Sequence, residues 1–175
     1  MKFNYYAFRA MYLHEMDRFK RTLMQSLFSP VLSTSLYFIV FGSVIGGYVE
    51  KIDGISYGSF IVPGLLMLTL LTQSISNTSF GIFFPKFNGT MYEILAAPIS
   101  TFEIVLAFVG AGATKTLLVG VVIFLTATFF VEVQVMYPLL MIFLLVLVAF
   151  TFALFGFLIG LMSSNFEQMS IVPTL

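Results

Sequence analysis

Four long apolar runs constrain this chain more than any other feature of its sequence. They lie at residues 30–47, 60–83, 104–131 and 138–162, and a helix of roughly 20 apolar residues crosses a bilayer. A segment in lipid must satisfy its backbone hydrogen bonds internally, so such runs fold as helices. Charged residues make up only 9% of the chain against about 25% in soluble domains. We therefore predict an all-α, polytopic transmembrane helical bundle of one domain, with four complete spans.

The charge and cysteine counts exclude several classes of function. The formal net charge is zero, which gives no case for a nucleic-acid partner. The absence of cysteine excludes disulfides and thiolate metal sites, and one histidine does not build a histidine-rich metal site. We expect no catalytic residue, no metal site and no cofactor on this chain, and membrane lipid as its surroundings.

Residues 3–25 carry an amphipathic pattern ahead of the first span. Apolar side chains recur every three or four positions, and polar or basic ones fall on the other side. Such a helix suits the interface between membrane and water. It either braces the first span or serves only as a flank that orients it. The apolar face is Phe8, Tyr12, Met16, Phe19 and Leu23, and the polar face is His14, Asp17, Arg18, Arg21 and Gln25.

Local signals in the spans predict a helix start and close helix packing. Ser29 suits a helix N-cap and Pro30 the first helical position, so we expect the first span to begin there. Small residues four positions apart predict faces where another helix approaches closely, although chance placement explains any single pair as well. These pairs are Gly42 with Gly46 in the first span and Gly156 with Gly160 in the fourth.

The second span is unusually polar in its second half. Thr69, Gln73 and Asn77 recur at four-residue steps and share one face. Unpaired polar groups in hydrocarbon cost several kcal/mol by order of magnitude, so these side chains seldom face lipid. They either line a pathway or form hydrogen bonds across helices, and the sequence leaves both interpretations open.

The stretch from Pro85 to Ser100 is a polar break between the second and third spans. Thr90 followed three positions later by Glu93 is a capping-box pattern. We predict a short helix within 88–98, with Asn88, Gly89 and Pro98 setting its ends; an ordinary capped loop is the alternative. If the helix is a surface for a partner, the contact residues are Thr90, Met91, Tyr92, Glu93, Ile94, Leu95, Ala96 and Ala97.

The third span is longer than the ~30 Å hydrocarbon core requires. Its N-terminal part is therefore expected to project beyond the bilayer, which places Lys115 near the interface. There we expect its ammonium group to snorkel toward water. The alternative is a functional role, which an ionisable residue inside a membrane suggests by default.

Basic residues predict the orientation of the chain. The flank ahead of the first span carries Lys2, Arg9, Arg18, Lys20 and Arg21, which places the N-terminus in the cytoplasm. The turns at 48–59 and 132–137 then lie outside, and the break at 84–103 and the turn at 163–168 lie on the cytoplasmic side. Residues 169–175 begin another apolar run, which we interpret as the start of a truncated fifth span.

The sequence carries no motif that would power transport. It has no phosphate loop of the GxxxxGK[ST] type, no HExxH motif and no pair of carboxylates inside a span. If the chain transports a substrate, the energy must come from another subunit through a cytoplasmic surface. The break between Pro85 and Ser100 is the best such surface.

Four stretches of the sequence stand out in combination: FIVPGLL at Phe60–Leu66, KFNGTMYEILAAPIS at Lys86–Ser100, VGAGATK at Val109–Lys115 and SSNFEQMSIVPTL at Ser163–Leu175. With these motifs the chain resembles the membrane subunits of type-2 ABC exporters, and most closely the bacterial inner-membrane transport permease branch. The resemblance covers nearly the whole chain.

This resemblance implies a permease, not an enzyme, with six membrane helices in the full-length family and both termini cytoplasmic. Two copies pair, and each docks a separate ATP-hydrolysing subunit that binds ATP and Mg²⁺. The family's coupling helix corresponds to Thr90–Ala97 and its amphipathic helix to Asn4–Arg21. The implied cargo is hydrophobic or amphipathic, such as a lipid-linked saccharide, a polysaccharide or a drug.

Two other classes of function stay open from the residues alone. A self-contained channel or secondary carrier would transport without an ATPase partner. A membrane-embedded scaffold or enzyme would need a polar cluster within the bilayer. The face of Gln73 and Asn77 is the one candidate for that cluster, and it holds no acid, base or metal ligand.

Overall fold

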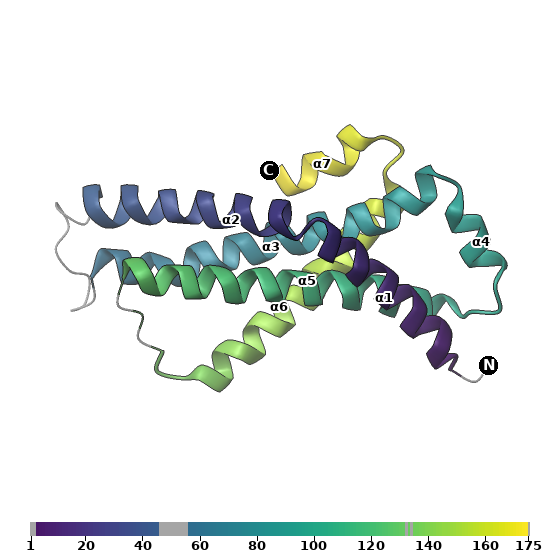
Figure 1. Ribbon diagram of the computed structural model, residues 1–175, viewed down its shortest axis with the longest axis horizontal. Coiled ribbons are helices and arrows are strands. Elements are labelled where there is room, and N and C mark those ends of the chain that lie inside the picture. The colour runs from purple at the N-terminus through teal and green to yellow at the C-terminus, as the bar shows by residue number, and fades with distance from the viewer. Residues whose placement is uncertain (1–2, 46–55, 132, 134, 175) are drawn as a thin grey trace.

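The computed structural model describes residues 3–45, 56–131, 133 and 135–174, and this part of the chain is a bundle of helices without strands (Figure 1). Four segments of it are long and apolar enough to cross a membrane by length and composition. The predicted fold class is therefore confirmed. The elements are α1 (Tyr5–Arg21), α2 (Leu23–Tyr37), the π-helical segment η1 (Phe38–Ile45), α3 (Tyr57–Phe87), α4 (Thr90–Ala96), α5 (Thr101–Phe130), α6 (Pro138–Met162) and α7 (Phe166–Thr174).

The first span begins earlier than its capping signal predicted. Pro30 lies buried inside α2 and not at the first helical position. The chain resumes a helix directly after Thr22, whose carbonyl accepts a hydrogen bond from Ser26 N at 2.9 Å. Proline is tolerated inside a membrane helix where neighbouring elements compensate for the lost backbone bond. The end of the predicted span at 46–47, including Gly46, lies outside the described residues.

The second and third spans extend beyond their predicted ends toward each other. α3 continues through Pro85 to Phe87, and α5 begins at Thr101. The predicted turn at 163–168 is shorter than expected, because α7 already starts at Phe166. Residues 48–55, 132 and 134 of the two predicted outer turns lie outside the described residues.

Helix α3 is packed between glycine-containing faces of α5 and α6. On α6, a Cβ added at Gly156 would lie 2.5 Å from the carbonyl oxygen of Ile75, and one at Gly160 would lie 2.6 Å from that of Ser79. On α5, a Cβ added at Gly120 would lie 2.9 Å from Cδ2 of the Leu70 side chain. The Gly156–Gly160 pair thus brings two helix backbones together, as predicted.

Helix α4 lies between the C-terminal end of α3 and the N-terminal end of α5, and it packs against a compact apolar cluster. Ile82, Ile104, Phe108 and Phe157 form part of this cluster. Figure 1 shows α4 at one end of the bundle, with the N-terminal end of α1 near it and α7 folded back beside α3. This end of the molecule therefore brings together α1, α3, α4 and α5.

Candidate functional site

Helix α4 is a separate short helix, but it does not start as the sequence pattern predicted. Its N-cap is Gly89, at φ +79°, and no side chain caps the helix. This left-handed backbone conformation favours glycine, and it allows the chain to change direction after α3. The predicted capping box of Thr90 and Glu93 is therefore wrong.

The capping box lies instead at the start of α5. Ser100 Oγ accepts a hydrogen bond from Glu103 N at 3.3 Å, and Glu103 Oε2 accepts one from Ser100 N at 2.8 Å. The other oxygen of Glu103 accepts a hydrogen bond from the backbone N–H of Asn4. A single buried carboxylate thus fixes the start of α5 and ties the N-terminal end of α1 to it.

The residues of α4 divide into two faces. Tyr92 is 77% exposed and Leu95 is 61% exposed. Met91 and Ile94 are half-buried and pack against the apolar cluster beneath the helix. Of the other predicted contact residues, Thr90, Glu93 and Ala96 are exposed and Ala97 is half-buried. Helix α4 therefore presents an apolar and acidic surface outward, while its other face is packed against the apolar cluster.

Lys86 connects the end of α3 to the end of α6. Its Nζ donates hydrogen bonds to the carbonyl oxygens of Leu161, at 2.6 Å, and Ser163, at 2.8 Å. The last carbonyl groups of a helix have no partner within it, and a cation there also complements the helix dipole. The residue that precedes α4 by one turn thus caps α6.

Lys115 does not snorkel, which corrects the expectation from the sequence. Its side chain is 3% exposed, and its Nζ donates to Glu15 Oε2 at 2.8 Å. The same oxygen lies 2.7 Å from Arg18 Nη2. A buried ammonium group is costly unless it is paired and hydrogen-bonded, and Glu15 on α1 supplies that partner. We name Glu15, Arg18 and Lys115 the ion cluster.

The surroundings of the ion cluster fit it closely. A Cβ at Gly81 on α3 would lie 3.3 Å from Glu15 Oε2 and 3.4 Å from Arg18 Nη2, so glycine leaves room for both side chains. The guanidinium carbon of Arg18 lies 5.3 Å from the ring centre of Phe80, a cation–π distance. The cluster therefore joins α1, α3 and α5 at one point.

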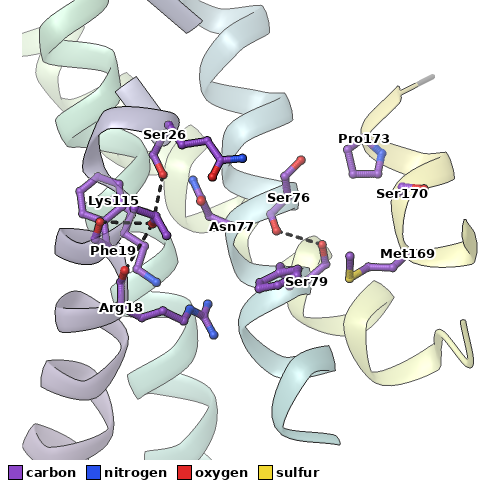
Figure 2. Close-up of a pocket in the computed structure, with 13 residues that line it drawn as sticks. Arg18, Phe19, Ser26, Ser76, Asn77, Ser79, Lys115, Met169, Ser170 and Pro173 are labelled. Atoms are coloured by element: carbon purple, nitrogen blue, oxygen red, sulfur yellow. Dashed lines mark hydrogen bonds between the residues drawn. The ribbon is translucent and has the colours of Figure 1, made fainter. Parts of the chain in front are cut away.

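A cavity of about 460 Å³ adjoins the ion cluster between the α1–α2 junction, α3 and α7. Figure 2 shows Arg18 and Lys115 on one side of it, Asn77 and Ser76 on α3, and Met169 and Pro173 on α7. The complete lining is Arg18, Phe19, Thr22, Gln25, Ser26, Ser76, Asn77, Ser79, Phe80, Lys115, Met169, Ser170 and Pro173.

The predicted polar face of α3 reaches this cavity at only one of its three residues. Asn77 lines the cavity and donates to Gln73 Oε1 at 3.4 Å, and Thr69 Oγ1 donates to its own helix at Leu65 O at 2.8 Å. A hydrogen bond from this part of α3 to another helix comes instead from Ser74, which donates to Ala149 O at 2.6 Å.

Sequence reasoning missed Glu15, although its position carried a signal. Glu15 follows Tyr12 by three positions and precedes Phe19 by four, so it lies on the apolar face of the predicted amphipathic helix. A carboxylate on that face becomes buried, and a buried charge is costly unless a cation pairs with it. In the described part of the chain, no group of three or more His, Asp or Glu side chains is placed to hold a metal ion.

Comparisons with known proteins show the family to which the sequence is similar. A family model described as ABC-2 type transporter matches residues 6–175. The inner membrane transport permease YadH of Escherichia coli K12 is 38% identical over 168 residues, which cover 96% of this chain and 66% of that protein. YadH of Shigella flexneri gives the same values. The chain thus spans just under two thirds of the length of these relatives. No solved structure matches it closely enough to count as similar.

Proposed function

The chain belongs to the ABC-2 type transporter family, and on that premise we propose that it is the permease subunit of an ATP-driven exporter. A separate subunit binds ATP and Mg²⁺ and hydrolyses the nucleotide, and that subunit docks on α4. The permease lies in a bacterial inner membrane with its N-terminus in the cytoplasm, and it pairs with a second copy. Its cargo is hydrophobic or amphipathic.

The observation that carries this proposal is the construction of α4. It is a short helix at the tip of the two longest membrane helices, with Tyr92, Glu93 and Leu95 pointing outward and Met91 and Ile94 held by the core. A force on the outward face is therefore transmitted to the bundle and is not absorbed by a loose loop.

The contacts around α4 suggest how such a force would spread. α3 and α5 are continuous helices, so a tilt of α4 moves both. Lys86 transmits the movement of α3 to the end of α6, and Glu103 transmits that of α5 to the start of α1. Closure of two ATPase subunits would in this way shift the helices of one permease copy together.

The docking role is tested by co-purification of the full-length permease with its ATPase subunit. The double variant Glu93→Arg plus Leu95→Asp replaces two exposed side chains of α4, and we expect it to lose the ATPase. The matched control is Asp17→Arg plus Leu13→Asp, which makes the same kinds of change at exposed positions of α1 away from its N-terminal end. Undiminished association of the α4 variant, or equal loss in the control, would refute docking on α4.

A further inference from the structure

The cavity beside the ion cluster has an excess of positive charge, which suits the binding of an anion. Two cations, Arg18 and Lys115, share the single carboxylate of Glu15, which leaves an excess of one positive charge. None of the residues that the structure describes as lining the cavity is acidic. A charge excess in a partly desolvated site interacts strongly with an opposite charge.

The other lining residues supply hydrogen-bond donors and an apolar wall. Gln25, Ser26, Ser76 and Asn77 carry amide or hydroxyl groups, and Phe19, Phe80 and Met169 carry apolar surface. Figure 2 shows Asn77 reaching from α3 into the space that faces Ser26 and Arg18. This combination fits a phosphodiester whose oxygens accept hydrogen bonds and whose attached groups include apolar chains.

The cavity also lies at the depth of a lipid headgroup. About 20 helical residues cross the ~30 Å hydrocarbon core. Counted from the start of α3 at Tyr57, this length ends at Asn77, and counted back from the end of α5 at Phe130, it ends at Gly110. Asn77, which lines the cavity, thus lies at this boundary, and Lys115 of the cavity lining lies five residues on the membrane side of Gly110.

We propose that this cavity binds the phosphodiester headgroup of a bilayer phospholipid with a net charge of minus one. Arg18 contacts a phosphate oxygen, and Asn77 and Ser26 donate further hydrogen bonds. The acyl chains run along the exposed apolar surface of α2, where Met24 is 84% and Phe28 is 62% exposed. The bound lipid neutralises the excess charge of the ion cluster. This site rests on the membrane location proposed above and not on the docking role of α4.

Native mass spectrometry of the full-length permease in mixed phosphatidylglycerol and phosphatidylcholine tests the site. We expect retention of phosphatidylglycerol over phosphatidylcholine, and roughly tenfold weaker retention in Arg18→Gln, since a charge-assisted hydrogen bond is lost. Arg21→Gln is the matched control, because it removes the same charge from an exposed position of the same helix outside the cavity. Asn77→Ala keeps the ion cluster intact and is expected to weaken retention as well; it decides the test if Arg18→Gln does not fold.

Equal retention of the two lipids by the wild type would overturn the site, as would equal losses in Arg18→Gln and Arg21→Gln. A second arm adds soluble glycerol 3-phosphate. If millimolar concentrations displace phosphatidylglycerol, the ligand is a free phosphate compound and the assignment to a lipid is wrong. If the wild type shows no preference for phosphatidylglycerol but still co-purifies with the ATPase subunit, this inference alone is refuted and the proposed function stands.

Discussion

Gly156 on α6 faces the backbone of α3 so closely that a methyl group does not fit. A Cβ there would lie 2.5 Å from the carbonyl oxygen of Ile75 and 2.9 Å from its Cα, whereas ordinary contact begins at 3.4 Å. Both neighbours are backbone atoms of a helix, so no side-chain rotation relieves the overlap. In the Gly156→Ala variant, α6 must therefore move away from α3 by about 0.9 Å at this crossing.

The expected cost follows from two opposing terms. Overpacking of a close-packed core costs about 1–3 kcal/mol, and alanine gains up to about 1 kcal/mol over glycine in helix propensity. We expect a net destabilisation of about 1–2 kcal/mol in Gly156→Ala. For a chain of this length, that lowers the apparent melting temperature by roughly 2–8 °C.

The assay is the loss of the monodisperse size-exclusion peak after heating the detergent-purified protein. Gly64→Ala is the matched control, because it makes the same substitution in a membrane helix where no atom lies within 4 Å of the added Cβ. The control is expected to melt at or slightly above the wild-type temperature. A Gly156→Ala variant as stable as Gly64→Ala would refute the close approach of α6 to α3.

Three further contacts can be tested in the same way. Glu15→Gln leaves Lys115 buried without its carboxylate and is expected to cost about 3–5 kcal/mol; the double variant with Lys115→Met should cost less than the sum of the single variants, and strict additivity would argue against the ion pair. Lys86→Met should speed amide hydrogen exchange in the last turn of α6, and unchanged exchange would contradict its capping role. Gly112→Ala places a Cβ 1.9 Å from Thr78 Oγ1, but rotation about the Cα–Cβ bond of Thr78 can move this side-chain oxygen away; we expect a smaller melting shift than in Gly156→Ala, partly reversed by Thr78→Ala, whose Cβ stays in place.

The features that depend on local sequence were largely predictable. Apolar run length predicted the four membrane helices, and the small residues at Gly156 and Gly160 predicted a close helix contact. The short helix of the central break was also predicted within its proposed limits. These properties follow from hydropathy and steric size at neighbouring positions, which a single sequence displays directly.

The errors arose where distant residues decide the structure. Pro30 carried a start signal, but the packing of α2 in the bundle overrides it. Thr90 matched a capping pattern, yet the backbone of Gly89 sets the start of α4 and Glu103 is used in a capping box of α5. The snorkelling predicted for Lys115 is wrong because its partner, Glu15, lies far away in the chain and no local pattern links the two.

The separation of Glu15 and Lys115 has a consequence for biosynthesis. The two residues are 100 positions apart, and a ribosome adds roughly 5–20 residues per second. α1 therefore leaves the ribosome about 5–20 s before its binding surface on α5 exists. During that interval Glu15 can pair with Arg18 of its own helix, but its contact with Lys115 is missing. We therefore expect α1 to take its final place against α5 only after Lys115 has been made, so that the attachment of α1 is a late event in assembly.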